Sequence, residues 1–237
     1  MYNGNEKLQI YWAGALFKHQ ELLGNLQLAK ALETVADGRV AVHLPQDGET
    51  ETSREAIAIR NADLAELCSC DAIVANFDGP ELDSGTVLEF AFAKALDLPA
   101  VLLRTDFRNG GDTADAPWNL MLHGWPRTET LWLNSMRQYH TIVRARGAEP
   151  ATAVAEWNRA VATRVLAALE RVCALSSWLT ADDALAHYRR TIRSVGGALE
   201  QLLTDDRLAE IIARKRRVGL LPPQAPRPPA PHSAGHG

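Results

Sequence analysis

Residues 71–103 read DAIVANFDGPELDSGTVLEFAFAKALDLPAVLL, and this stretch decides the fold. It begins with a short apolar run, Asp71 to Phe77, of the kind that forms a buried strand. An acidic turn follows, then an apolar helix that begins near Ser84, and then a second buried run from Pro99 to Leu103. Two strands joined by such a helix pair in parallel, because a parallel neighbour needs a long return connection.

The same alternation extends to both sides of this stretch. Apolar runs at 8–13 and 39–44 indicate strands, and the periodic segments 20–36 and 53–70 indicate helices. Residues 130–133 (TLWL) indicate a further strand. The sequence therefore predicts an α/β fold: an open, mostly parallel five-stranded sheet flanked by helices, Rossmann or flavodoxin-like. Ligands of such sheets bind at the carboxyl ends of the strands.

The composition changes towards the C-terminus. The segments between 151 and 217 are rich in Ala, Leu and Arg and carry no strand signal, which predicts two or three appended helices, one of them spanning 181–203. The end of the chain is Pro-rich and has few core-forming residues. We expect three parts: an α/β domain over 1–148, a C-terminal helical extension over 149–218, and a disordered Pro-rich tail over 219–237.

Charge and composition exclude several classes of function. The chain has 237 residues, 46% of them hydrophobic, and a net charge of -4, so it lacks the basic surface that nucleic-acid binding requires. No stretch of about 18 apolar residues occurs, and the start carries no export signal, so we expect no membrane partner and a cytoplasmic location. The three cysteines, Cys68, Cys70 and Cys173, suit a reducing compartment and structural burial.

The acidic turn and the helix after it carry more charge than a turn needs. Asp83 or Ser84 can cap the helix, Gly79 can make the turn, and carboxylates near a helix start interact well with its dipole. This account leaves Glu89 unexplained, because Leu88 and Phe90 flank it in an apolar helix. The acids of this segment are Asp78, Glu81, Asp83 and Glu89.

A carboxylate placed like Glu89 has a chemical use. Close to a helix N-terminus we expect it to stay ionised, and enclosure by Leu and Phe leaves it poorly hydrated. Such a group is a competent nucleophile towards an electrophilic sugar carbon. Glycosyl transfer with retention uses one carboxylate in that role and a second acid to protonate the leaving group.

Metal and phosphate chemistry have no comparable signal. The histidines show no paired ligand spacing with cysteines or acids, so we predict no metal and no cofactor. The loop AGALF after the first strand lacks the glycine pattern of a phosphate-binding loop. The isolated histidines of residues 1–148 are His19, His43, His123 and His140.

With these features in place, the chain resembles the nucleoside 2-deoxyribosyltransferase family. The resemblance covers roughly residues 8–135, and its segments keep the family's order and spacing. It is carried by IYWAGALF (10–17), Pro45-Gln46, NADL (61–64), DAIVANFDG followed by DSGTVLEFAFA (71–93), and PWNLM (117–121).

The resemblance implies a role for each matching residue. It identifies Glu89 as the nucleophile that forms a covalent deoxyribosyl-enzyme intermediate. It identifies Tyr11 as the residue that positions this glutamate, and Asp63 as the residue that assists proton delivery to the departing base. It further implies that Asp83 holds the substrate and that Gln46 lies on the base side.

The rest of the implied site comes from loops and from a second subunit. Asn119 and Met121 match positions that reach into a neighbouring subunit's active site, which implies a homo-oligomer with shared sites. Trp12 and Phe17 resemble the aromatic residues that line the family's site near the base. The loop residues of the predicted substrate-binding set are Gly14, Phe17, Asp78, Gly79 and Ser84.

Three functions stay open at this point. The first is transfer of 2-deoxyribose between nucleobases, with a deoxynucleoside and a free nucleobase as partners. The second is hydrolysis at the same site, by a nucleoside or nucleotide N-glycosidase. The third is a non-catalytic nucleoside- or nucleotide-binding module. About a hundred residues follow Leu133, whereas compact family members end soon after the last strand, so any role of the family's chain terminus is not carried over.

Overall fold

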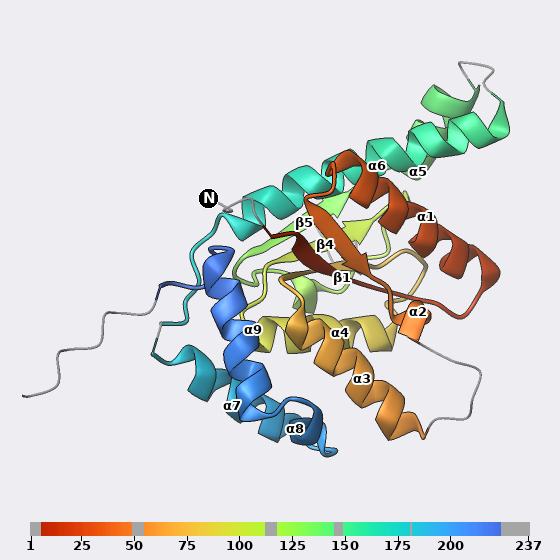
Figure 1. Ribbon diagram of the computed structural model, residues 1–237. Helices are drawn as coiled ribbons and strands as arrows, with labels where there is room; N and C mark the ends of the chain where they lie inside the picture. Colours follow the sequence, from red (N-terminus) through yellow and green to blue (C-terminus); the bar gives the residue numbers. More distant parts are fainter. Residues whose placement is uncertain (1–5, 49–54, 112–117, 145–148, 181, 224–237) are drawn as a thin grey trace, which may run out of the picture.

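The computed structural model describes residues 6–48, 55–111, 118–144, 149–180 and 182–223. Its centre is a five-stranded sheet in the order β2-β1-β3-β4-β5, in which every neighbouring pair is parallel (Figure 1). This confirms the predicted fold class. The strands are β1 (Leu8–Gly14), β2 (Val40–His43), β3 (Ala72–Asn76), β4 (Ala100–Arg104) and β5 (Thr128–Trp132).

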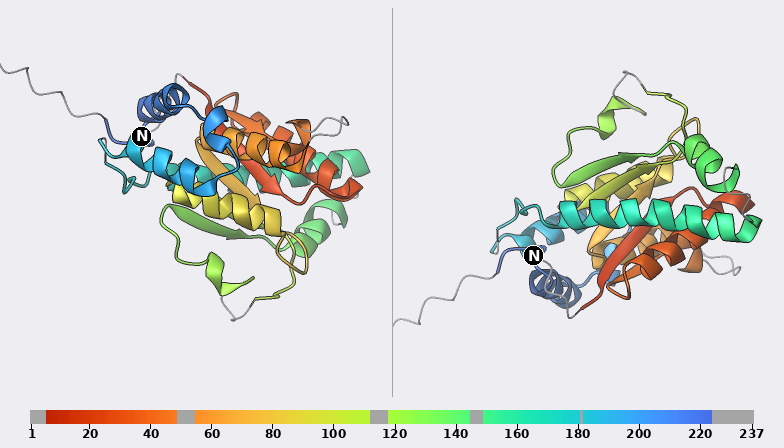
Figure 2. Two further views of the ribbon diagram at one scale, coloured as in Figure 1. Left: turned by 90° about the horizontal axis from the view of Figure 1, so that it is seen from below. Right: turned by 90° about the horizontal axis from the view of Figure 1, so that it is seen from above.

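Helices cover both faces of the sheet. One face packs against α1 (His19–Val35) and α6 (Pro150–Cys173), and Figure 2 shows α6 lying along it. The other face packs against α3 (Ala56–Ser69) and α4 (Ser84–Ala95), with the C-terminal helices alongside. Those are α7 (Ala184–Val195), α8 (Leu199–Leu202) and α9 (Asp205–Arg217). Short helical segments lie in three further connections: α2 (Pro45–Gly48) after β2, η1 (Leu120–Leu122) after β4, and α5 (Ser135–Gln138) with η2 (Tyr139–Arg144) after β5.

The alternation along β1 separates two hydrophobic cores. Tyr11 and Ala13 pack into the core under α3 and α4, whereas Ile10 and Trp12 pack into the core under α1 and α6. All four side chains are at most 1% exposed. Burying a large apolar side chain stabilises a fold by roughly 1.5–3 kcal/mol, so each face of β1 contributes to stability.

The C-terminal helices share these cores. Val161, Val165 and Leu169 of α6 lie in the same cluster as Val101 of β4, so α6 closes one face of the sheet. On the other face, α9 is tied to the start of β3 by an ion pair of 2.5 Å between Arg214 Nη2 and the fully buried Asp71 Oδ2. The boundary near residue 148 stays a prediction.

The expectation of one helix over 181–203 is wrong. Gly196 and Gly197 both have φ of 67°, a left-handed conformation that ends α7 and separates it from α8. At Gly197 a Cβ atom would lie 2.7 Å from Arg60 Nη1 and 2.8 Å from Ile57 Cδ1, so the turn packs tightly on α3. The described part of the chain thus has four helices after residue 149, where two or three were expected.

None of the helices in the described segments combines the length and apolar character needed to cross a membrane. Most of the predicted tail, residues 224–237, lies outside the described residues.

Candidate active site

The central feature of the site is a hydrogen bond between β1 and α4. The Tyr11 hydroxyl donates to Glu89 Oε1 over 2.5 Å. Tyr11 is fully buried and Glu89 is partly buried, so the carboxyl group faces the protein rather than bulk solvent. A distance of about 2.5–2.7 Å is typical of a hydroxyl that donates to a charged oxygen.

Local sequence explains why these two side chains meet. Tyr11 lies on the β1 face that packs under α4. The start of α4 is fixed by its N-cap, Asp83, whose Oδ2 accepts from the backbone nitrogen and the hydroxyl of Thr86, both at 2.7 Å. This confirms the expected cap. Glu89 stands six residues after the cap, so it faces β1 from the second turn of the helix.

Burial decides the charge of the pair. It raises the pKa of Glu89 to about 7. The hydrogen bond from Tyr11 lowers this pKa, whereas the charges of Asp63 and Asp83 raise it further. Burial and the neighbouring Glu89 also raise the pKa of Tyr11 far above its usual range. The expectation that Glu89 stays fully ionised is therefore corrected: near pH 7 its carboxyl group is divided between two forms.

Asp63 lies on α3, on the same side of the sheet as the pair. Its charge raises the pKa of both Tyr11 and Glu89. The predicted proton-delivery residue therefore lies close enough to the predicted nucleophile to affect its charge. The structure thus brings together four of the predicted site residues: Tyr11, Glu89, Asp63 and Asp83.

Sequence reasoning missed the residues behind Tyr11. His43 on β2 is the register partner of Tyr11 in the β1–β2 ladder. Its Nδ1 lies 2.8 Å from Glu66 Oε1 and its Nε2 lies 2.7 Å from Gln9 Oε1. Since both strands end at the same sheet edge, the position of His43 one residue before the end of the predicted strand was the signal that could have found it.

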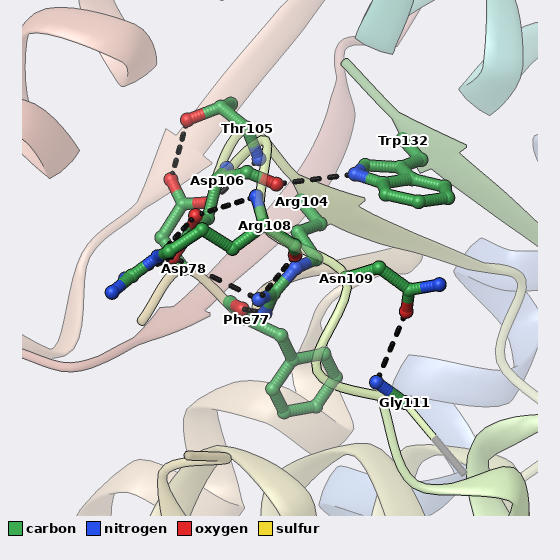
Figure 3. Close-up of polar contacts among 9 residues, drawn as sticks. All are labelled: Phe77, Asp78, Arg104, Thr105, Asp106, Arg108, Asn109, Gly111 and Trp132. Atoms are coloured by element: carbon green, nitrogen blue, oxygen red, sulfur yellow. Dashed lines mark hydrogen bonds and ion pairs between the residues drawn. The ribbon is translucent and has the colours of Figure 1, made fainter. Parts of the chain in front are cut away.

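Asp78 has a structural task that its place in the acidic turn did not suggest. Its Oδ1 accepts from the backbone nitrogens of Thr105 and Asp106 at 2.5 and 2.8 Å, and its Oδ2 accepts from the Thr105 hydroxyl at 2.7 Å. Beside it, Arg104 Nη1 donates to Phe77 O over 2.8 Å (Figure 3). Both oxygens of Asp78 therefore join the loop after β3 to the loop after β4.

The base-side residue of the prediction belongs to a network centred on Asn25. The Asn25 Nδ2 donates to Ala15 O at 3.0 Å and to Gln46 Oε1 at 3.5 Å, and its Oδ1 accepts from Trp12 Nε1 at 3.2 Å. Gln46 is thus connected to the loop that follows Gly14. Trp12 lies in the core on the α1 side of the sheet, opposite to Tyr11, and its expected place in the aromatic lining stays a prediction.

Several predicted residues lie at the surface. Phe17 is 77% exposed in the loop after β1, and Ser84 is exposed at the start of α4. Gly79 adopts φ of 123° in the acidic turn, a value that favours glycine.

The segment around η1 is also at the surface but is anchored to α4. Asn119 and Met121 are both exposed, Met121 by 72%. Trp125 donates from Nε1 to Met121 O over 3.0 Å and stacks edge-on against Phe90 with ring centroids 5.6 Å apart. Because Phe90 follows Glu89, this contact holds η1 near the helix that carries the predicted nucleophile.

Among the described residues, no three His, Cys, Asp or Glu side chains lie close enough together to hold a metal ion.

Comparison with known proteins finds a family match in the α/β region. Residues 10–121 match the family model described as nucleoside 2-deoxyribosyltransferase. This segment contains Tyr11, Asp63 and Glu89. No curated protein matches the chain.

Three solved structures are similar to the chain at low identity. A conserved protein from Enterococcus faecalis V583 has 20% identity, covers 70% of this chain and 98% of its own, and gives a TM-score of 0.45. A 2-desoxiribosyltransferase from Leishmania mexicana has 25% identity, with coverages of 59% and 99% and a TM-score of 0.42. A 2-deoxyribosyltransferase from Bacillus psychrosaccharolyticus has 18% identity, with coverages of 61% and 95% and a TM-score of 0.41.

The family match covers slightly less than half of the chain, but it includes most of β1, all of β3, α4 and β4, and the hydrogen-bonded pair between β1 and α4. Over residues 10–121, the α/β region of the chain therefore matches the nucleoside 2-deoxyribosyltransferase family.

Proposed function

We propose that this protein transfers 2-deoxyribose between nucleobases through a covalent glycosyl-enzyme intermediate on Glu89, with retention of configuration. The observation that carries the proposal is the 2.5 Å hydrogen bond from the Tyr11 hydroxyl to Glu89 Oε1. It lies within the segment that matches a family whose substrates are nucleosides and nucleobases.

In the first step, a carboxylate oxygen of Glu89 attacks the anomeric carbon of the deoxynucleoside. A carbon–oxygen bond forms while the carbon–nitrogen bond to the base breaks, and the electron pair of that bond leaves with the base. Tyr11 holds Glu89 in one orientation for this attack. Asp63 delivers a proton to the departing base, which its influence on the charges of Tyr11 and Glu89 supports.

In the second step, a nitrogen of the incoming base attacks the same carbon, the carbon–oxygen bond to Glu89 breaks, and the proton of that nitrogen passes to Asp63, which restores the acid. Two inversions at one carbon give net retention. Asp83 and Gln46 hold the nucleoside in this scheme, together with the loop residues Gly14, Phe17, Gly79 and Ser84. Asp78 contributes by fixing the loop after β3, since both of its oxygens are already bonded.

The proposed enzyme is a homo-oligomer with shared sites. Asn119 and Met121 reach the sugar in a neighbouring subunit, a role that their exposure supports. We place the enzyme in the cytoplasm, which the three unpaired cysteines support.

A base-exchange assay tests the proposal. The protein is mixed with deoxyinosine and free cytosine or adenine, and the products are separated by chromatography. A new deoxynucleoside is the expected result. Free hypoxanthine and deoxyribose without a new nucleoside would show that the protein is a hydrolase instead of a transferase. An unchanged mixture with several combinations of nucleoside and base would show that it only binds nucleosides.

A further inference from the structure

A cavity lies between α3 and the C-terminal helices, and none of Tyr11, Asp63, Asp83 and Glu89 lines it. It has a volume of about 600 Å³, within the range of roughly 300–1,000 Å³ that small-molecule sites occupy. Its wall combines the sheet and α3 with α8 and α9, so it requires residues well beyond the segment that matches the family. The wall includes Gln9, His43, Glu66, Leu202, Arg207 and Arg214.

The charges of the wall indicate the chemistry of a ligand. The carboxylate of Glu66 is engaged by His43 at 2.8 Å, and Arg214 is engaged by Asp71 through both terminal nitrogens. Arg207 differs, because its Nη1 donates to the Leu202 carbonyl at 3.0 Å. Within the described segments, no carboxylate lies within ion-pair distance of Arg207. An anion is therefore the group that complements this wall.

The cavity also adjoins the residues behind the active site. His43 is the register partner of Tyr11 on β2, and Glu66 follows Asp63 by three positions, the spacing of neighbours on one helix face. A molecule that moves His43 or Glu66 therefore changes the surroundings of Tyr11 and Asp63.

We propose that this cavity binds a small phosphate ester through Arg207 and that the bound ester changes the rate of the reaction at Glu89. The site gives the C-terminal helices a regulatory task, since they supply Leu202, Arg207 and Arg214. Only the effect on rate rests on the proposed function, because binding can be measured without turnover.

Binding is tested by calorimetry with glycerol 3-phosphate at constant ionic strength, which keeps general screening of surface charge equal. The wild type is expected to bind one equivalent per chain. Arg207→Gln should weaken binding by about tenfold or more, the loss expected for one charge-assisted hydrogen bond. Arg190→Gln removes an exposed arginine of α7 outside the cavity wall and should bind as the wild type does.

Three results would overturn the site: no binding by the wild type, equal binding by Arg207→Gln, or displacement of glycerol 3-phosphate by saturating deoxyinosine, which would locate it in the active site. In the exchange assay, the ester should change the wild-type rate by about fivefold, a modest allosteric coupling, and leave Arg207→Gln unaffected. An unchanged wild-type rate would refute the effect on catalysis. Binding through Arg207 in a protein that exchanges no bases would support the site and refute the proposed function instead.

Discussion

The two ends of the parallel sheet treat buried carboxylates in opposite ways. At the amino end, Asp97 has a cation partner: Arg127 Nη1 lies 2.9 Å from its Oδ2, and the Ser177 hydroxyl donates to the same oxygen at 2.6 Å. At the carboxyl end, Glu89 accepts a hydrogen bond from the neutral Tyr11 and lies near two further acids. No cation forms an ion pair with Glu89 among the residues that the structure describes.

This difference separates stability from chemistry. A buried carboxylate with a cation partner has its charge compensated, and removing that partner mainly costs stability. A buried carboxylate without one has a raised pKa and a poorly hydrated charge, which are the properties of functional groups in enzymes. The segment after α9 takes part at the amino end, where Arg127 Nη2 also donates to Leu220 O over 3.2 Å.

The largest effect is expected at the uncompensated carboxylate. Glu89→Ala should lower base exchange by about 10⁴-fold or more, because binding alone cannot replace a group that forms a covalent bond. Its melting temperature should stay close to the wild-type value, since the substitution removes a costly buried charge. Initial rates and circular dichroism measure both.

The control for this variant is Glu210→Ala, which removes an exposed acid of α9. It should leave the rate unchanged. A normal exchange rate for Glu89→Ala would mean that another group is the nucleophile. The contrast between a catalytic carboxylate at one end of the sheet and a structural one at the other would then be wrong.

The compensated carboxylate should respond in stability. Arg127→Met leaves the charge of Asp97 buried without its cation, which costs roughly 3–5 kcal/mol of unfolding free energy. Adding Asp97→Asn removes that charge and should restore part of the loss. Urea unfolding measures both variants. As a comparison, Arg171→Met breaks an exposed pair with Glu129 and should cost much less. Equal losses for Arg127→Met and Arg171→Met would contradict the importance of burial.

How far the sequence predicts this molecule differs between its parts. Hydrophobic periodicity predicts the strands and helices, because runs such as 71–77 and 99–103 are short, apolar and bounded by turn residues. Gly196 and Gly197 indicate a break in the sequence, but the segments on both sides of them have a helical pattern that also fits one continuous helix. Its tight packing on Arg60 depends on tertiary structure.

The candidate site is predictable only in outline. Tyr11 and Glu89 could be expected at the carboxyl end of the sheet from the fold and from the resemblance to the family. The hydrogen bonds from Asp78 to the loop after β4 could not be predicted, because they depend on where that loop lies. The raised pKa of Glu89 could not be predicted either, since it depends on how deeply α4 packs on β1. The side of the sheet on which Trp12 lies follows from the alternation of side chains along β1, and a comparison of sequence motifs does not take this alternation into account.

The charge of Glu89 predicts a pH dependence. Its pKa is raised to about 7, and only the deprotonated form is a nucleophile, so kcat/KM should rise with pH and level off above about pH 8. At pH 5, two units below this pKa, the value should be about a hundredfold lower than the plateau. Rates between pH 5 and 9 measure this, with circular dichroism at each pH to confirm folding. A profile that is flat from pH 5 to 8 would contradict an uncompensated, buried Glu89.

The smallest effect is expected for Tyr11→Phe, which removes one hydroxyl and keeps the buried ring. The rate at the pH plateau should fall by about tenfold, the value of one hydrogen bond that orients the nucleophile. The hydrogen bond from Tyr11 lowers the pKa of Glu89, so its loss should raise that pKa and move the rising limb of the pH profile to higher pH. A residue that only packs the core would lower the rate or stability without moving the limb. The shift of the limb therefore measures whether Tyr11 tunes the uncompensated carboxylate or merely fills the space beneath it.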